Sequence, residues 1–254
     1  MRYIGLLMIA NEDDILADVL ASHHTIADDI YVLDGSEPGG LSETICAAGA
    51  NVRGYMRDSQ LPRPPYPDRP VDGYRQYLYE GAVLDHGPDN WFLLLHGDEV
   101  WTFDPRDLVD EHPDADGFGF RLPCYFPHAD DGWDDSRGPL EQLRWRLGPG
   151  WPEFRMFRGA AHVGFDQAQH FNVIPGGLER IVWTDRVINH YPFRSPEAQR
   201  ARARQHEASG FDPDNYRHIL DEDRVLWDDE LIGRYQASSS NFALLQGSEA
   251  VYAA

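Results

Sequence analysis

The chain has 254 residues, of which 42% are hydrophobic and 12% aromatic, a composition that excludes a disordered chain and suffices for one large folded domain or two small ones. Its 43 acidic residues outnumber 22 basic ones, and the formal net charge of −21 excludes a general nucleic-acid-binding surface, which must attract a polyanion. Every basic residue is arginine, so lysine-dependent nucleophilic, Schiff-base and Walker-type phosphate chemistry is excluded as well.

No apolar run reaches the roughly 18 residues that a membrane-spanning helix needs. The two cysteines, Cys46 and Cys124, predict neither a disulfide framework nor a cysteine-based zinc site. The short apolar run near the start is interpreted as a buried strand, because no small-residue cleavage site follows it as in a signal peptide. We therefore expect a cytoplasmic protein with no integral membrane segment and no nucleic-acid partner.

The first third of the chain alternates between strand and helix patterns. A predicted helix over residues 11–24 has Asn11 in position to act as its N-cap and an apolar face that includes Val19 and Leu20. The fourth strand begins with five apolar residues, Trp91–Leu95, which is typical of a strand buried on both faces. In chain order, the predicted strands cover residues 2–9, 29–36, 50–56 and 91–95, and the predicted helices cover 11–24 and 73–85.

Strands and helices that alternate at this spacing predict βαβ units and a parallel sheet, on which ligands bind beyond the carboxyl ends of the strands. Asn11 follows the first strand, Asp34 ends the second, and His96, Asp98 and Glu99 follow the fourth. Two neighbouring carboxylates are costly to bury there unless a cation, hydrogen-bond donors or a water-filled cleft meets them. The sequence therefore predicts a polar ligand site at this edge.

The second half of the chain is less regular. Residues 117–126 and 151–159 predict strands, with an acidic loop between them. Arg155 and Arg158 are three positions apart, so they face opposite sides of a regular strand, and we expect Arg155 to point into the shared cleft. The stretch VINHYPFRSPEAQ predicts a strand and then a helix from Pro196 onward.

Three stretches carry a resemblance to a known family: MIANEDDILADVL at the first strand, DIYVLDGSEPGG at the second and WFLLLHGDEVW at the fourth. Together they resemble the family 2 glycosyltransferases of the GT-A fold, and among these the bacterial surface-polysaccharide and antibiotic-type members. The resemblance is good over residues 1–105 and patchier beyond, where WPEFRMFRG and HYPFRSPEAQ resemble segments of the same relatives.

The resemblance implies an α/β fold of GT-A type, with a mostly parallel mixed sheet flanked by helices. It implies one glycosyltransferase-like domain over residues 1–211, made of a nucleotide-binding half, 1–105, and an acceptor-side half, 106–211. Residues 212–254 are expected to form a C-terminal helical tail.

The implied activity is the transfer of a sugar from a nucleotide-diphosphate donor, with a UDP-sugar favoured, to a hydroxyl of a carbohydrate or another acceptor. The resemblance implies inversion at the sugar and assistance by a divalent metal, Mn²⁺ or Mg²⁺, which an Asp-x-Asp motif holds on the diphosphate. Here the motif reads His96-Gly97-Asp98, so histidine replaces the first aspartate and the second, usually the direct ligand, is kept. The expected metal ligands are Asp98, His96, Glu99 and His190.

The donor is expected to contact the turns at the strand ends and two arginines. These residues are Ala10, Asn11, Glu12, Asp34, Arg75, Gly97 and Arg155. Simpler interpretations stay open for several of them: Asn11 as an N-cap, Asp34 as part of an ordinary turn, and Arg75 as a surface residue. Glu99 either binds the metal or only orients its neighbours.

Inverting transfer also needs a carboxylate base near the acceptor hydroxyl. The middle of the chain is rich in acidic residues, and no clear Glu-Asp motif stands where the family usually has one. The sequence therefore leaves the base unidentified, and the candidates are Glu153, Asp166 and Asp134.

Other functions remain open alongside a glycosyltransferase. A non-catalytic sugar-nucleotide-binding or scaffold protein of the same fold agrees with the histidine at position 96 and the unidentified base. A nucleotidyltransferase would use a similar cleft, but it typically has a glycine-rich phosphate loop and a lysine near its first strand, whereas this turn reads IANEDD. A metal-dependent hydrolase is the third alternative, but the sequence contains neither the His-x-His nor the His-Glu-x-x-His spacing that would support it.

Overall fold

The structure is a computed structural model that describes residues 1–36, 39–57, 70–161, 165, 176–209, 217–220, 222, 224–239 and 250–252. Its strands are β1 (Tyr3–Ile9), β2 (Asp29–Asp34), β3 (Val52–Arg57), β4 (Trp91–His96), β5 (Glu99–Trp101), β6 (Gly117–Phe126), β7 (Trp145–Arg158), β8 (Ile181–His190) and β9 (Ala250–Tyr252). Its helices are α1 (Leu16–Ile26), α2 (Ser42–Ala48), α3 (Pro70–His86), α4 (Pro105–Glu111), α5 (Pro139–Gln142), α6 (Pro196–Ser209), α7 (Arg217–Leu220) and α8 (Asp229–Ser239), and Gly159–Ala161 form a 3-10 turn.

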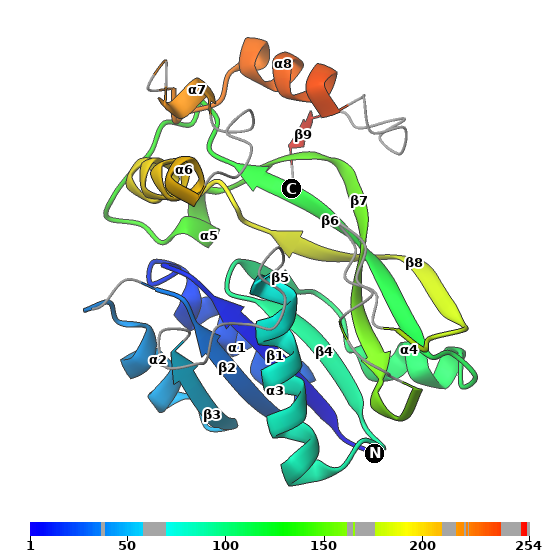
Figure 1. Ribbon diagram of the computed structural model, residues 1–254. Helices are drawn as coiled ribbons and strands as arrows, with labels where there is room; N and C mark the ends of the chain where they lie inside the picture. Colours follow the sequence, from blue (N-terminus) through cyan, green and yellow to red (C-terminus); the bar gives the residue numbers. More distant parts are fainter. Residues whose placement is uncertain are drawn as a thin grey trace. The chain divides into compact units, whose positions relative to one another are not determined.

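The described strands form one sheet in the order β3-β2-β1-β4-β7-β6-β8-β5, with β9 paired to β7 (Figure 1). Strands β3, β2, β1 and β4 are parallel to one another, and β7 joins β4 in the antiparallel direction. The sheet is therefore mixed and is flanked by helices, so the predicted α/β class is confirmed.

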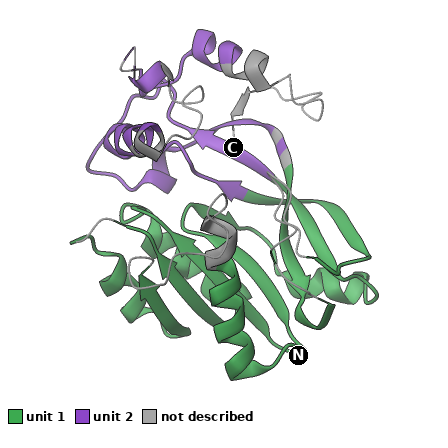
Figure 2. Cartoon of the chain, in the orientation of Figure 1, with its two compact units in different colours: residues 1–121, 152–188 green, residues 122–151, 189–254 purple. Residues whose placement is uncertain are grey.

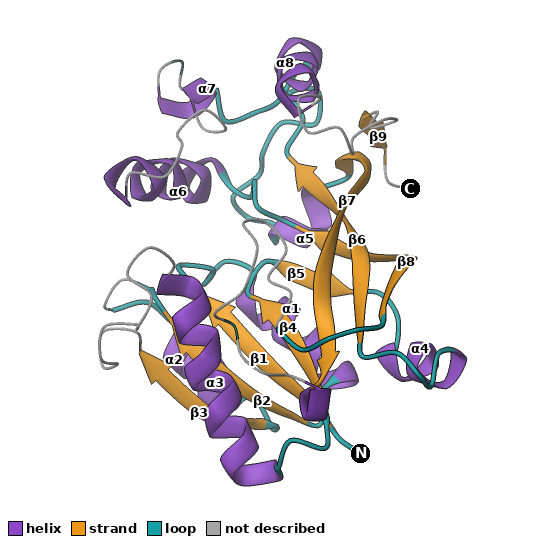
Figure 3. Ribbon diagram, turned by 45° about the vertical axis from the view of Figure 1, so that its right-hand side comes forward, coloured by secondary structure: helices purple, strands orange, loops and turns teal. Residues whose placement is uncertain are grey.

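Helices cover both faces of the parallel strands. The connections through α1 and α2 advance along the sheet from β1 to β3, whereas α3 returns from β3 to β4 in the opposite direction. Because such crossovers are right-handed, α3 covers one face and α1 and α2 cover the other, as Figure 3 shows. Among the helices that the structure describes, none is long and apolar enough to cross a membrane.

The chain divides into two compact units (Figure 2). Each unit has its own apolar core, which includes Phe92 and Phe157 in unit 1 and Phe126 and Trp227 in unit 2. The segment expected to form a C-terminal helical tail contributes α7, α8 and β9, and it belongs to unit 2. Unit 1 consists of residues 1–121 and 152–188, and unit 2 of residues 122–151 and 189–254.

The apolar run of β4 lies inside unit 1. All residues from Trp91 to Leu95 are at most 1% exposed, as expected for a strand covered on both faces. The ring centroid of Phe92 lies 4.9 Å from that of Tyr79 on α3 and 5.5 Å from that of Phe157 on β7. These contacts fix the point at which β4 ends and the polar residues begin.

The structure departs from the prediction at the start of α1. The helix begins at Leu16, with Ile15 before it, so the prediction that Asn11 is its N-cap was wrong. Asn11 has a φ of 65°, which lies outside the extended region that an N-cap residue adopts. The predicted apolar face is confirmed, because Val19 and Leu20 are buried.

Candidate active site

The structure brings three of the predicted site segments to one edge of the parallel strands. The register pairs Ile9 at the end of β1 with Asp34 at the end of β2. On the other side of β1, Met8 pairs with His96 at the end of β4. Because neighbouring strands lie about 4.8 Å apart, the backbones of Asp34 and His96 are about 10 Å apart. The strand ends therefore form one continuous polar edge.

The turn after β1 is tied to the turn after β2. The backbone N–H of Asn11 donates to Oγ of Ser36 at 2.8 Å, and its φ of 65° lies in the left-handed region that asparagine tolerates better than most residues. The buried carboxylate of Glu12 accepts a hydrogen bond from the N–H of Ala10. Such strained backbone persists only where the surrounding structure fixes it, and it concentrates at functional sites.

Gly97 connects the turn after β4 to the same edge. Its N–H donates to the carbonyl oxygen of Met8 at 3.0 Å. A Cβ at this position would lie 2.8 Å from Cγ2 of Ile9 and 2.9 Å from Oε2 of Glu12. Glycine is therefore required here because side chains of the β1 turn fill the adjacent space.

Gly97→Ala is expected to displace the Glu12 carboxylate and to lower the free energy of unfolding by about 1–3 kcal/mol, the usual cost of overpacking. Urea denaturation measures this change. Gly81→Ala in α3 is the matched control, because a Cβ there meets no atom within 4 Å and alanine favours the helix. Equal stability of the two variants would show that the turn after β4 accepts a side chain.

Asp34 ends β2 as a buried carboxylate with several donors. Its Oδ1 accepts from the N–H of Ser36 at 2.7 Å, and its Oδ2 accepts from the hydroxyl of Ser42 at 2.6 Å and from that of Tyr55. Nη2 of Arg57 lies 3.6 Å from Oδ2. Burial alone raises the pKa of Asp34, but the hydrogen bonds from Ser36, Ser42 and Tyr55 outweigh burial and hold the pKa below its usual range. Asp34 is thus kept as a carboxylate that braces β2 against β3.

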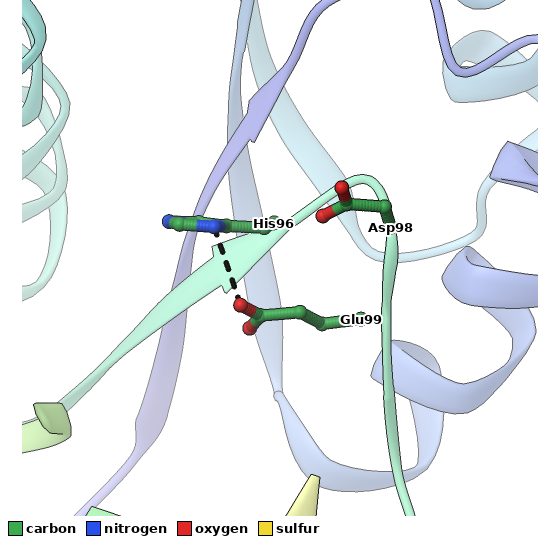
Figure 4. A group of neighbouring side chains, drawn as sticks. All are labelled: His96, Asp98 and Glu99. Atoms are coloured by element: carbon green, nitrogen blue, oxygen red, sulfur yellow. Dashed lines mark ion pairs between the residues drawn. The ribbon is translucent and has the colours of Figure 1, made fainter. Parts of the chain in front are cut away.

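His96, Asp98 and Glu99 form a compact cluster around the turn between β4 and β5 (Figure 4). One potential ligand atom from each residue lies within 4.8 Å of the others. Asp98 and Glu99 are both buried. Figure 4 shows the imidazole of His96 beside the carboxylate of Glu99, with Asp98 on the connecting turn.

Arg75, His96, Glu99, Arg155 and Glu153 form a continuous series of contacts that we call the charge network. Nη2 of Arg75 lies 2.8 Å from Nε2 of His96, and Nδ1 of His96 lies 3.3 Å from Oε1 of Glu99. Arg155 donates to both oxygens of Glu99, at 2.7 Å from Nη2 to Oε1 and 3.0 Å from Nε to Oε2. The same Nη2 also donates to Oε2 of Glu153. The guanidinium of Arg155 therefore meets the buried Glu99 carboxylate directly, and that of Arg75 is linked to it through His96.

Arg155 and Arg158 face opposite sides of β7, as the sequence predicts. Arg155 is buried against Glu99, whereas the guanidinium of Arg158 lies 5.3 Å from the ring centroid of Trp91. Burial alone lowers the pKa of Arg155, but the carboxylates of Glu153 and Glu99 outweigh burial and raise it. Arg155 therefore remains a cation in the charge network.

The potential ligand atoms at this edge, most of which are carboxylate oxygens, fit a hard divalent cation, which prefers such ligands. Asp98 offers a buried carboxylate on the turn itself, with one potential ligand atom within 4.8 Å of those of His96 and Glu99. Among the side chains described above, five carboxylates outnumber three guanidiniums, which favours the binding of a cation. The negative groups are Glu12, Asp34, Asp98, Glu99 and Glu153, and the positive groups are Arg57, Arg75 and Arg155.

The remaining predicted site residues are distributed over the chain. His190 belongs to unit 2, where its Nδ1 lies 3.5 Å from Sγ of Cys124. Asp134 also belongs to unit 2, and hydrogen bonds from Ser136 hold the pKa of its exposed carboxyl below the usual range. Asp166 lies outside the described residues. Glu153 is thus the base candidate that the structure places in the charge network.

Two side chains of α1 hold the backbone of β5, a contact that the sequence gives little sign of. Nε2 of His23 lies 3.0 Å from the carbonyl oxygen of Glu99. Oγ of Ser22 accepts from the N–H of Trp101 and donates to its carbonyl oxygen, both at 3.1 Å. The one available signal is that His23 stands four positions after Val19, on the apolar face of the helix. Helix α1 thereby fixes the strand that carries Glu99.

His23 predicts a loss of stability in acid. It is fully buried, and burial lowers its pKa from 6.5 to about 3. Below pH 6.5 the unfolded chain binds a proton that the folded chain excludes, so this contribution to stability is complete above pH 6.5 and declines as the pH falls toward 3. The expected decrease in the free energy of unfolding between pH 7.5 and 4.5 is about 2–3 kcal/mol from this residue.

Urea denaturation of the wild type and of His23→Gln at both pH values measures this contribution. Glutamine can still donate to the Glu99 carbonyl but does not titrate, so the variant should lose about 2–3 kcal/mol less on acidification. Other groups, including His218, whose pKa burial lowers to about 4, titrate in both proteins and cancel in the difference. An identical pH dependence of the two proteins would contradict the assignment.

Comparisons with known proteins find similarity only among solved structures. No protein-family model and no curated protein matches the chain. The structure of HddC from Yersinia pseudotuberculosis is similar with a TM-score of 0.39 and 9% identity, over 75% of this chain and 93% of HddC. A protein named as a nucleotide-diphospho-sugar transferase, from Desulfovibrio desulfuricans G20, has a TM-score of 0.37 and 10% identity over 96% of each chain.

A protein named as a glucose-1-phosphate thymidylyltransferase, from Bacillus anthracis, has a TM-score of 0.30 and 11% identity over 54% of this chain. The match spans 62% of the length of that relative. All three TM-scores lie below 0.5, so the function has to be inferred from the site itself, and membership of family 2 stays a prediction.

Proposed function

We propose that the protein is a metal-assisted glycosyltransferase that takes its sugar from a nucleotide-diphosphate donor. One observation carries the proposal: the cluster of His96, Asp98 and Glu99 at the end of β4 shares an edge with Asp34 at the end of β2. Ligands of parallel α/β sheets bind at this edge. The carboxylates make this edge negative, so a diphosphate needs a divalent cation in order to approach it.

In this proposal the two ends of the donor meet different parts of the edge. Asp98 would hold a divalent cation, Mn²⁺ or Mg²⁺, against the diphosphate. When bound, the cation supplies positive charge against the negative charge that develops on the departing diphosphate. The nucleoside would lie toward the end of β2, where the buried carboxylate of Asp34 accepts from the N–H of Ser36 and so fixes the turn that the base or the ribose would meet. A UDP-sugar is the favoured donor.

Glu153 acts as the base in this scheme. Its side chain is 20% exposed, whereas that of Glu99 is 0% exposed, so an acceptor hydroxyl can reach the former. The carboxylate of Glu153 takes the proton of the acceptor hydroxyl while that oxygen attacks the anomeric carbon. The bond from this carbon to the diphosphate oxygen breaks, and its electron pair leaves with the diphosphate. Attack from the opposite side inverts the anomeric configuration.

Calorimetry with UDP, GDP and CMP, each with and without Mn²⁺, tests the proposal. UDP should bind at least as tightly as GDP, and Mn²⁺ should strengthen UDP binding at least about tenfold, as expected when one charged contact is added. A clear preference for GDP or CMP would overturn the choice of donor. Slow hydrolysis of a UDP-sugar should accompany binding, and binding without any turnover would favour a non-catalytic sugar-nucleotide-binding protein instead.

A further inference from the structure

We infer that His96 is a positioning residue that joins Arg75 to Glu99, and that it does not bind the cation at Asp98. The expected effect of His96 on the KM rests on the proposed function, whereas its contacts with Arg75 and Glu99 do not. The resemblance to family 2 glycosyltransferases implies that His96 stands at the first position of the Asp-x-Asp motif, where a metal ligand is expected. Its contacts with Arg75 and Glu99 indicate instead that His96 positions these two side chains.

The contacts of His96 determine which of its nitrogens carries hydrogen. Arginine has donors and no acceptor, so Nε2 of His96, 2.8 Å from Nη2 of Arg75, must be the acceptor of that bond. A neutral imidazole with a bare Nε2 has its hydrogen on Nδ1. Nδ1 lies 3.3 Å from Oε1 of Glu99, so its hydrogen has an acceptor within reach. Each ring nitrogen is thus engaged by a protein group of the matching kind.

With an uncharged His96 ring, the charge network is electrically neutral. Two guanidiniums, Arg75 and Arg155, match the two carboxylates Glu99 and Glu153, with the uncharged ring of His96 between Arg75 and Glu99. An aspartate at position 96 would instead add a carboxylate beside Glu99, which is fully buried, and like charges repel strongly there. Histidine is therefore suited to hold Arg75 at the edge while Asp98 contributes the carboxylate for the cation.

Two kinds of variant separate a positioning residue from a ligand. His96→Gln can reproduce both contacts, because its amide oxygen accepts and its amide nitrogen donates, whereas His96→Ala removes both. We expect His96→Ala to raise the KM for the donor at least tenfold and His96→Gln to recover most of that loss. Asp98→Asn is the reference for loss of a metal ligand.

Binding of Mn²⁺, followed by electron paramagnetic resonance, is the decisive measurement on these variants. We expect the Kd for Mn²⁺ to change less than threefold in His96→Gln and His96→Ala, and to rise at least thirtyfold in Asp98→Asn. A rise in both His96 variants that equals the rise in Asp98→Asn would overturn the inference, because it would identify His96 as a ligand.

Nitrogen NMR of the imidazole tests the tautomer without substrate or activity. The expected spectrum of the wild type has hydrogen on Nδ1 and a bare Nε2, unchanged when Mg²⁺ is added. Hydrogen on Nε2, or a large shift of either nitrogen with Mg²⁺, would contradict the inference. If the protein proves not to be a transferase, the KM comparison fails for every variant while the NMR result still decides the role of His96.

Discussion

Asp98→Asn is expected to reduce sugar transfer at least about 100-fold while the protein stays folded. The carboxylate stands at the end of an apolar strand whose five preceding core residues are at most 1% exposed, so its position is fixed by packing. Asparagine has nearly the same size and can still hydrogen-bond, but it lacks the charge that a divalent cation requires. Loss of such a charge raises the barrier by several kcal/mol, and 1.36 kcal/mol corresponds to a tenfold change in rate.

Transfer or slow donor hydrolysis, measured over a Mn²⁺ titration, checks this result beside a melting curve. Asp89→Asn is the matched control, because Asp89 is an exposed aspartate just before β4 and its substitution should change neither quantity. Full activity in Asp98→Asn, or wild-type turnover that EDTA leaves undiminished, would show that the turn after β4 is not a metal site.

Glu99→Gln is expected to have the larger effect on stability, about 3–5 kcal/mol, the usual result of removing one partner of a buried ion pair. Glu99 is fully buried and accepts hydrogen bonds from Arg155 on both oxygens. Neutralising it leaves the Arg155 guanidinium with Glu153 as its remaining partner in the charge network. The free energy of unfolding, from urea denaturation at pH 7.5, measures the loss.

The double variant Glu99→Gln/Arg155→Met provides the control for this interpretation. Methionine removes the buried charge and keeps an apolar side chain of comparable length, so the double variant should recover at least half of the loss seen in Glu99→Gln. A loss below about 1 kcal/mol in the single variant, typical of an exposed ion pair, would show that Glu99 is not held by Arg155 as described.

The parallel strands could be predicted because their signal is local. Strands β1, β2 and β4 are apolar runs, and the physical reason for such runs, burial on both faces, acts on each strand independently. Helix α2 (Ser42–Ala48) escaped prediction because it has seven residues and buries only Ser42 and Cys46, so it shows little helical periodicity. Asn11 was misassigned because a side chain suited to an N-cap also suits a left-handed turn.

The sequence predicts which edge of the sheet carries the candidate site, but it does not predict which side chains contact one another there. That polar residues after successive strands share an edge follows from the parallel arrangement alone. The pairing of Glu99 with Arg155 joins residues 56 positions apart, and no local pattern specifies such a contact. Strand parity correctly placed Arg155 and Arg158 on opposite faces of β7, and it also places Glu153 on the same face as Arg155. The role of His96 as a link between Arg75 and Glu99 depends on tertiary distances that sequence does not carry.

The hydrogen bonds from α1 to the backbone of β5 have a consequence for solubility. Strand β5 stands at the end of the sheet order, and an exposed terminal strand offers its backbone N–H and C=O groups to a second chain, a route to aggregation. Ser22 and His23 already bind the carbonyl oxygens of Glu99 and Trp101 and the N–H of Trp101. At these groups the helix takes the place that a neighbouring strand would fill, so it makes intermolecular β-pairing along β5 less favourable.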